Sequence, residues 1–225
     1  MPITVRYPAP ETSDLTRAEE ALRLADRPLI VCDVDDVVLQ FVTPFKAFLE
    51  HQGHRLVPRS FRLHGNIVRA LDEAPLEDAV VTSLIDGFFA AQETWQTPFV
   101  GVVEALQRLS ADADLVFLTA MPPRHAEARR RLLDRFELRY PLIAADEPKG
   151  PLVHRLHQER TLPLAFIDDM SHNLHSVGSH IPHCLLIHLP PPVDIHALAP
   201  PAAAPARRAS DWEEAEAMIR AHFSL

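Results

Sequence analysis

The amino-acid sequence predicts an α/β protein, with a Rossmann-like parallel sheet between two layers of helices and a small helical cap inserted after the first strand. Short, uniformly apolar runs of strand length alternate with segments at helical spacing, which is typical of a parallel sheet covered on both faces. The interval 41–96 lacks such runs but shows helical spacing. The 225 residues, 47% of them hydrophobic, suffice for one substantial core, alone or with a smaller inserted domain.

The apolar runs are the expected strands. The first covers residues 29–32 and follows a short helical pattern at 13–25. Later runs lie at 115–118, 142–144, 164–167 and 184–189, and helical spacing separates them, most clearly at 124–138 and 151–159. This alternation predicts the doubly wound core.

The expected cap covers residues 41–96, which leaves 1–40 and 97–225 for the core. Its clearest helix lies at 76–92, where apolar residues from Val80 to Phe89 recur at helical spacing. The interval offers no strand-like apolar run. The alternative is that these helices pack directly on the sheet as part of a single domain.

The C-terminal part is expected to hold a connector and a last helix. Residues 190–209 are rich in Pro and Ala and have little to bury. A helix should begin at Ser210, because Ser210 and Glu213 have the spacing of a capping box. Its apolar face should dock on the core and consists of Trp212, Ala215, Met218, Ile219 and His222.

Composition excludes several classes of function. The net charge of -9 and the pI near 5.8 argue against nucleic acid as a partner, because phosphate backbones are met by clustered basic residues. No apolar run is long enough to span a membrane, and the N-terminus lacks a signal-peptide pattern. Cys32 and Cys184 lie in apolar runs, which favours buried thiols over a disulfide. We expect a cytoplasmic location, and a homo-oligomer stays open.

Two acidic clusters follow apolar runs, at the point where each expected strand ends. Asp33, Asp35 and Asp36 come after the first run, and Asp168 with Asp169 ends the run at 164–167. Crowded carboxylates need a compensating cation, and Mg²⁺ prefers such oxygen ligands. Because ligands bind at the carboxyl edge of open α/β sheets, the sequence predicts a magnesium site there.

Thr119 and Lys149 are candidates for binding phosphate. Thr119 ends the run at 115–118, and its hydroxyl and the backbone N–H of Ala120 could donate to phosphate oxygens. Lys149 is one of only two lysines beside 20 arginines, and it precedes a helix expected to start near Pro151. A cation is unfavourable at that end of a helix, so we expect it to serve the site. The alternatives are a helix cap for Thr119 and a surface lysine for Lys149.

In this order, the motifs resemble those of the haloacid dehalogenase-like superfamily, phosphatase branch with a small helical cap. They are an Asp-x-Asp after the first strand, a strand-terminal Thr, a Lys before a helix, and an acidic pair, over residues 28–189. Two positions depart from the pattern. Asn173 stands where many relatives have an acid, which suggests a hydrogen bond to Lys149 or to a metal-bound water, and Asp36 stands where a glycine is common.

The resemblance implies a role for each matching residue. Asp33 would be the nucleophile and Asp35 the general acid and base, while Thr119, Ala120 and Lys149 would bind the phosphoryl group. Mg²⁺ would be held by Asp33, by the backbone carbonyl of Asp35 and by Asp169, with Asp168 a ligand or a supporting partner.

The implied function is hydrolysis of a small phosphate monoester through an aspartyl-phosphate intermediate. The alternatives are a phosphomutase, a phosphonate-cleaving enzyme with Lys46 as its only candidate cap lysine, and a phospho-acceptor or binding domain without turnover. Five histidines between 172 and 188 are weighed as a soft-metal cluster and disfavoured, because no cysteine stands at zinc-ligand spacing. The locally basic stretch 51–69 is either an anion-facing lid or a solvated face.

Overall fold

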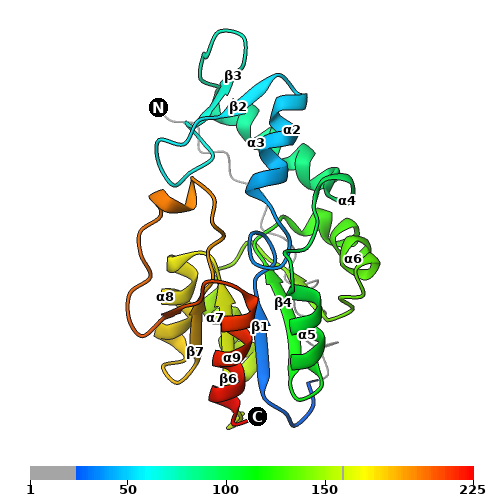
Figure 1. Ribbon diagram of the computed structural model, residues 1–225, viewed down its shortest axis with the longest axis vertical. Helices are drawn as coiled ribbons and strands as arrows, with labels where there is room; N and C mark the ends of the chain where they lie inside the picture. The colour runs from blue at the N-terminus through cyan, green and yellow to red at the C-terminus, as the bar shows by residue number, and fades with distance from the viewer. Residues whose placement is uncertain (1–23, 159) are drawn as a thin grey trace.

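A six-stranded parallel sheet forms the centre of the protein (Figure 1). The computed structural model describes residues 24–225, residue 159 excepted, so the helix expected at 13–25 falls outside the described residues except for its last two, which are not helical. The strand order is β5-β4-β1-β6-β7-β8, and each neighbouring pair is parallel. The strands are β1 (Leu29–Cys32), β4 (Asp114–Thr119), β5 (Leu142–Ala144), β6 (Leu164–Asp168), β7 (Leu185–His188) and β8 (Arg207–Arg208).

Helices cover both faces of the sheet, as predicted. Alternate residues of β1 point to opposite faces: Ile30 joins one buried cluster and Val31 the other. The first cluster takes its helical residues mainly from α5 and α9, and the second from α7 and α8. These helices, with α6 beside the β5 edge, are α5 (Val102–Ser110), α6 (Ala126–Arg135), α7 (Lys149–His157), α8 (Ser171–His180) and α9 (Trp212–Phe223).

The insert after β1 lies beyond the carboxyl ends of the strands, at the top of Figure 1. It contains α2 (Val42–His51), β2 (His54–Leu56), β3 (Ile67–Arg69), α3 (Asp78–Ala90) and α4 (Gln92–Trp95). The helical insert is confirmed, and it also contains an antiparallel hairpin of β2 and β3, for which the sequence showed no apolar run. These strands have only three residues each and include exposed arginines, so they lack an apolar run.

Aromatic packing holds the insert together and ties it to the sheet. Phe45, Phe48 and Phe88 form a buried trio whose ring centroids lie 5.2 to 6.2 Å apart. Met121 and Ala144, which follow β4 and end β5, belong to the same buried cluster. The insert therefore packs on the carboxyl edge of the sheet, which is also where the acidic clusters lie.

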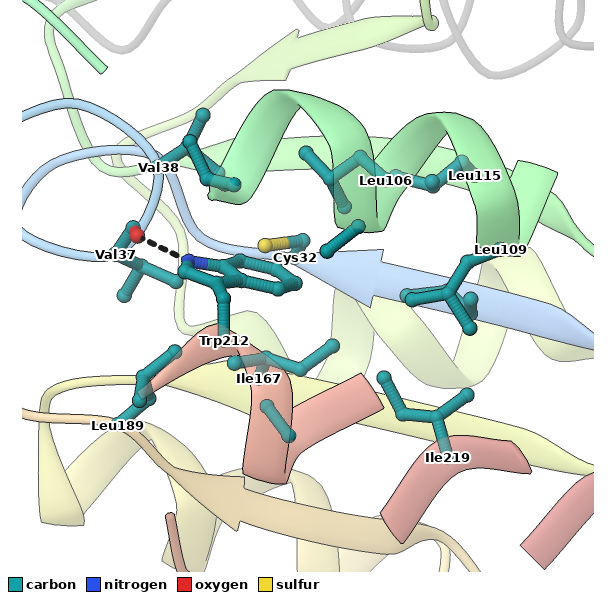
Figure 2. Close-up of a cluster of buried hydrophobic side chains, with 14 of the residues drawn as sticks. Cys32, Val37, Val38, Leu106, Leu109, Leu115, Ile167, Leu189, Trp212 and Ile219 are labelled. Carbon is teal, nitrogen blue, oxygen red and sulfur yellow. Dashed lines mark hydrogen bonds between the residues drawn. The ribbon is translucent and has the colours of Figure 1, made fainter. Parts of the chain in front are cut away.

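Helix α9 docks against the loop that carries the first acidic cluster (Figure 2). The Trp212 indole N–H donates to the backbone oxygen of Val37 at 2.9 Å, and its ring lies among buried side chains that include Cys32 and Ile167. Burial of a tryptophan with a satisfied N–H is strongly stabilising. The last helix thus supports the back of the loop 33–39.

The start of α9 differs from the predicted capping box by one residue. The N-cap is Asp211, whose side chain accepts from the backbone N–H of Glu214 at 2.9 Å, and the Glu214 carboxylate accepts from Ser210. A carboxylate at this position also interacts favourably with the positive end of the helix dipole. On the apolar face, His222 is exposed and Phe223 is buried in its place.

The Pro- and Ala-rich connector is more ordered than its composition suggests. It contains a short 3₁₀ helix, η2 (His196–Leu198), and strand β8, and in Figure 1 its orange part rises toward the insert. Two contacts join it to the insert. Lys46 Nζ lies 2.6 Å from Asp194 Oδ1, and the rings of Phe61 and His196 are 5.2 Å apart.

Cys32 and Cys184 are both free and buried, as predicted. In the described ranges, 24–158 and 160–225, no helix combines the length and the apolar character needed to cross a bilayer.

Candidate active site

Three carboxylates converge where β1 and β6 end. Asp33 follows β1 directly, Asp168 is the last residue of β6, and Asp169 comes next. One oxygen of each lies within 4.8 Å of the others, and all three residues are buried. Within the described part of the chain, the histidines between 172 and 188 form no group with this geometry. The predicted acidic cluster is therefore assembled from two separate strands.

Crowding of these acids disfavours their charged forms. Burial raises the pKa of Asp33 to about 7. The charge of Lys149 lowers this pKa, whereas the charges of Asp168 and Asp35 raise it further. Burial also raises the pKa of Asp169 well above its usual range, with contributions from Asp168 and Asp33. One lysine thus does not neutralise the cluster. A divalent cation would, and an all-oxygen donor set fits Mg²⁺.

Lys149 lies between the two acidic clusters. It is the first residue of α7, so the helix begins two residues earlier than predicted. Its ammonium group contacts Asp33 Oδ1 and lies 2.7 Å from Asp168 Oδ2. Burial would lower the pKa of Lys149, but the charges of Asp168 and Asp33 outweigh it and the pKa is raised. The lysine is therefore buried and charged, and the alternative of a surface lysine is wrong.

Asp168 is already fully engaged by hydrogen bonds. Besides Lys149, it accepts from the backbone N–H of Met170 at 2.8 Å. Asn173 Nδ2 donates to both of its oxygens at 3.1 Å. The Nδ2 group of Asn173 therefore binds Asp168 and not Lys149, and the expected bond to a metal-bound water stays a prediction. This leaves Asp33 and Asp169 as the carboxylates with more capacity to bind a cation.

Asp35 is held by a buried arginine that sequence reasoning missed. Arg129, on α6, donates to Asp35 through both terminal nitrogens, at 3.0 and 2.9 Å. Gln96 Nε2 adds a bond of 2.9 Å. Arg129 lies three and four residues before Leu132 and Leu133, so helical spacing places it on the buried face of α6, but that spacing does not indicate its partner.

Thr119 ends β4 next to this pair. Its hydroxyl lies 3.3 Å from Asp35 Oδ2 and accepts from the backbone N–H of Met121 at 3.1 Å. Ala120, exposed at the same edge, lines a common cavity with Thr119 and Asp33. The predicted phosphate-binding residues therefore lie together with the predicted nucleophile.

Asp36 and His196 form a second unpredicted pair. Asp36 has a φ of 59°, in the left-handed region where glycine is common, and its side chain accepts from the backbone N–H of Phe41 at 2.8 Å. Asp36 Oδ2 also lies 3.1 Å from His196 Nε2, which must donate to it. His196 Nδ1 is buried without a partner among the described residues. Its place in a low-complexity connector gave no signal.

A cavity of about 300 Å³ lies between the acidic cluster and the insert. Arg62, in the loop between β2 and β3, is among its lining residues. Other arginines of the basic stretch pair on the outside: Arg55 with Glu73 and Arg69 with Asp72. The basic side chains of the stretch therefore lie largely on a solvated face, and of its arginines only Arg62 contributes to the wall of the cavity.

Comparison with solved structures finds the same fold in several proteins described as hydrolases, a phosphatase or a phosphomutase. A predicted phosphoglycolate phosphatase from Haemophilus somnus matches with a TM-score of 0.56 at 14% identity, over 87% of this chain and 99% of its own. A haloacid dehalogenase family hydrolase from Deinococcus radiodurans, with bound phosphate and sodium, matches at 0.55 and 15%, over 86% and 95%. A putative beta-phosphoglucomutase from Thermotoga maritima matches at 0.54 and 18%, over 86% and 99%.

The fold is that of an α/β protein with a parallel sheet and a helical insert after β1. More narrowly, it is the haloacid dehalogenase-like fold that the order of the motifs predicted. The likeness at these identities is one of fold. At the level of sequence, neither a family model nor a curated protein matches the chain.

Proposed function

We propose that the protein is a Mg²⁺-dependent phosphohydrolase that cleaves a small phosphate monoester through a covalent phosphate on Asp33. The observation that carries this proposal is the meeting of Asp33, Lys149 and Thr119 at the wall of one cavity. Asp33 follows β1, Lys149 begins α7 and Thr119 ends β4, so their meeting is a product of the fold. A nucleophile, a cation and a hydroxyl donor at one point are the parts that phosphoryl transfer needs.

Asp33 and Asp169, with the backbone carbonyl of Asp35, would hold the metal ion. Mg²⁺ bound there would offset the negative charge of the carboxylates and of the phosphoryl group. Asp168 would act indirectly, because its bonds to Lys149 and Asn173 fix the ammonium group beside the nucleophile.

In the first step, an oxygen of Asp33 attacks phosphorus while the bond to the leaving alcohol breaks. Lys149, the Thr119 hydroxyl and the Ala120 N–H would hold the phosphoryl oxygens. Asp35 would give a proton to the departing oxygen. In the second step, Asp35 takes a proton from water, which attacks the phosphorus of the aspartyl-phosphate and releases inorganic phosphate and Asp33.

Asp35 must exchange a hydrogen bond to perform these transfers, because Arg129 and Gln96 occupy its oxygens. The long bond from Thr119, at 3.3 Å, is the weakest of its contacts. Exchange of this Thr119 bond for a hydrogen bond between Asp35 and the leaving oxygen would therefore disturb the site least.

The test is phosphate release from an aryl phosphate by the purified protein, with and without Mg²⁺. Asp33→Asn should lower kcat by about a thousandfold or more, because it removes the nucleophile. Asp26→Asn, at an exposed position away from the cavity, is the matched control and should keep full activity. Equal release by wild type and Asp33→Asn would refute the proposal.

The alternative of a phosphonate-cleaving enzyme loses support, because that activity would need a lysine of the insert at the active site. The only candidate cap lysine, Lys46, pairs with Asp194 at 2.6 Å, and the cavity is lined without it. A role for Lys46 in fastening the insert to the connector accounts for its position.

A further inference from the structure

The part of the cavity beyond the acids has a mainly apolar wall. Six of its apolar lining residues are Phe41, Phe61, Leu63, Phe89, Met121 and Met170. The first four belong to the insert or its junction with β1, and the last two follow β4 and β6. A group attached to the phosphate would therefore meet aromatic rings, aliphatic carbon and thioether sulfur.

The wall offers few free polar groups to that part of a substrate. Asp35 and Asp36 are engaged by Arg129 and His196, and Asn173 donates to Asp168. Among the described lining residues away from the phosphate site, three groups are left over: the Arg62 guanidinium, whose side chain has no hydrogen bond or ion pair, Asn173 Oδ1 and His196 Nδ1. A leaving group with several hydroxyls would bury some of them unpaired, at a cost of roughly tenfold each in affinity.

The aromatic part of the wall is fixed before any ligand binds. The rings of Phe41 and Phe89 lie 5.6 Å apart, and Phe41 also packs edge-on against Phe88 at 5.3 Å. The Arg129 guanidinium lies 5.8 Å from the centroid of the Phe89 ring. A rigid apolar surface binds an apolar group with little loss of side-chain entropy.

We propose that the natural leaving group is a small apolar alcohol, aromatic or branched aliphatic, rather than a sugar or a nucleoside. This inference rests on the proposed function, because it assumes that the phosphoryl group sits at Asp33 and Lys149. The loop that carries Phe61 and Leu63 is the specificity element, since it places two apolar side chains of the insert over the acids. The volume of about 300 Å³ is at the small end for ligand pockets, which keeps the leaving group small.

The first experiment measures binding without turnover. In the presence of Mg²⁺, calorimetry compares 2-phenylethylphosphonate with 2,3-dihydroxypropylphosphonate, which carry the same charge on chains of similar length. We expect the phenyl compound to bind about 10- to 100-fold more tightly, as burial of an aromatic ring implies. Equal affinities, or tighter binding of the dihydroxy compound, would overturn the inference.

Variants locate the preference. Phe61→Ala should weaken binding of the phenyl compound about tenfold and leave methylphosphonate unaffected, because methylphosphonate lacks the group that reaches the ring. Leu71→Ala, at a 97% exposed position on the same insert, is the control and should change neither. If Phe61→Ala weakens binding of 2-phenylethylphosphonate and methylphosphonate equally, the loop does not contact the leaving group and the inference fails.

Turnover separates this inference from the proposed function. 2-Phenylethyl phosphate and glycerol phosphate both release alkyl alcohols, so their intrinsic reactivity is matched. We expect kcat/KM to favour the phenyl compound about tenfold or more. Faster hydrolysis of glycerol phosphate would overturn the inference and leave the phosphohydrolase intact. Release from neither, with the phosphonate preference retained, would refute the proposed hydrolysis and leave the ligand class standing.

Discussion

Arg129 and Asp35 form a bidentate ion pair between helix α6 and the loop after β1. The two bonds measure 3.0 and 2.9 Å, the Arg129 side chain is completely buried, and that of Asp35 is 19% exposed. Arg129 also donates to Gln92 and to Gln96, both of the insert or its return to the core. The position of the proposed acid and base is therefore set jointly by the core and the cap.

Removal of this arginine should cost stability as well as activity. Arg129→Met leaves the Asp35 carboxylate without its main partner, and we expect a loss of about 3 kcal/mol in the free energy of unfolding, measured by urea denaturation. Arg129→Lys keeps the charge but loses the two-pronged geometry, and should lower kcat about 10- to 100-fold with a smaller change in KM.

Arg131→Met on the same helix is the control. Its side chain is 59% exposed and pairs with Glu93, so the variant should lose less than about 1 kcal/mol. If Arg129→Met and Arg131→Met lose equal free energy of unfolding, the buried pair of Arg129 and Asp35 does not stabilise the fold more than a surface pair does.

We expect Asp169 to destabilise the metal-free protein and to stabilise the protein when Mg²⁺ is bound. Asp169→Asn removes a charge from a crowded buried cluster, so without metal its melting temperature should be no lower than that of wild type. Mg²⁺ at a hundred times its Kd should raise the wild-type melting temperature by about 5–10 °C, and that of Asp169→Asn far less. Calorimetric scans with and without EDTA measure both. An equal Mg²⁺ response in the two proteins would place the metal elsewhere.

The core strands and their terminal acids were predictable because each depends on a local pattern. Strands buried on both faces must be uniformly apolar, so β1 and β6 stand out, and a polar residue directly after such a run must lie at the sheet edge. The acid cluster at Asp33 and Asp168 follows from those two facts alone.

The remaining parts of the site depend on tertiary packing that no local pattern records. His196 comes from a connector whose composition indicates little structure, and only the fold brings it to Asp36. Arg129 is one of three consecutive arginines, and the helical face that it shares with Leu132 distinguishes it only once the helix is placed. The hairpin β2–β3 was missed because its strands are too short to show alternation.

The close approach of α7 to α8 should make Gly150 irreplaceable. A Cβ at this position would lie 2.4 Å from the backbone oxygen of Ser176, so Gly150→Ala must push α7 away and carry Lys149 with it. We expect a loss of about 2 kcal/mol in unfolding free energy and a fall in kcat. Gly87→Ala is the matched control, because its nearest neighbour would be the Phe48 ring at 3.7 Å, and it should gain about 0.5–1 kcal/mol. Full activity of Gly150→Ala would show that α7 need not pack this closely to place the lysine.

The attachment of α9 should depend on pH through Glu216. Its carboxylate is 10% exposed and accepts from Arg108 at 2.6 Å and from Arg220 at 3.0 Å. The hydrogen bond from Arg108 is the main reason why the pKa of Glu216 lies below its usual range in the folded protein. The unfolded chain therefore binds this proton more tightly, so the stabilisation is present at pH 7 and is lost as pH falls through the folded pKa.

Glu216→Gln should accordingly lower the free energy of unfolding by about 1 kcal/mol at pH 7, and the difference from wild type should shrink toward zero below about pH 4. Urea denaturation across this range measures it. Glu73→Gln is the control, because that carboxylate is 76% exposed and pairs with Arg55 at the surface, where solvent screens the interaction. Its effect should stay within about 0.5 kcal/mol at every pH. A Glu216→Gln difference that persists unchanged at pH 4 would mean that packing of the side chain, and not its charge, attaches α9 to α5.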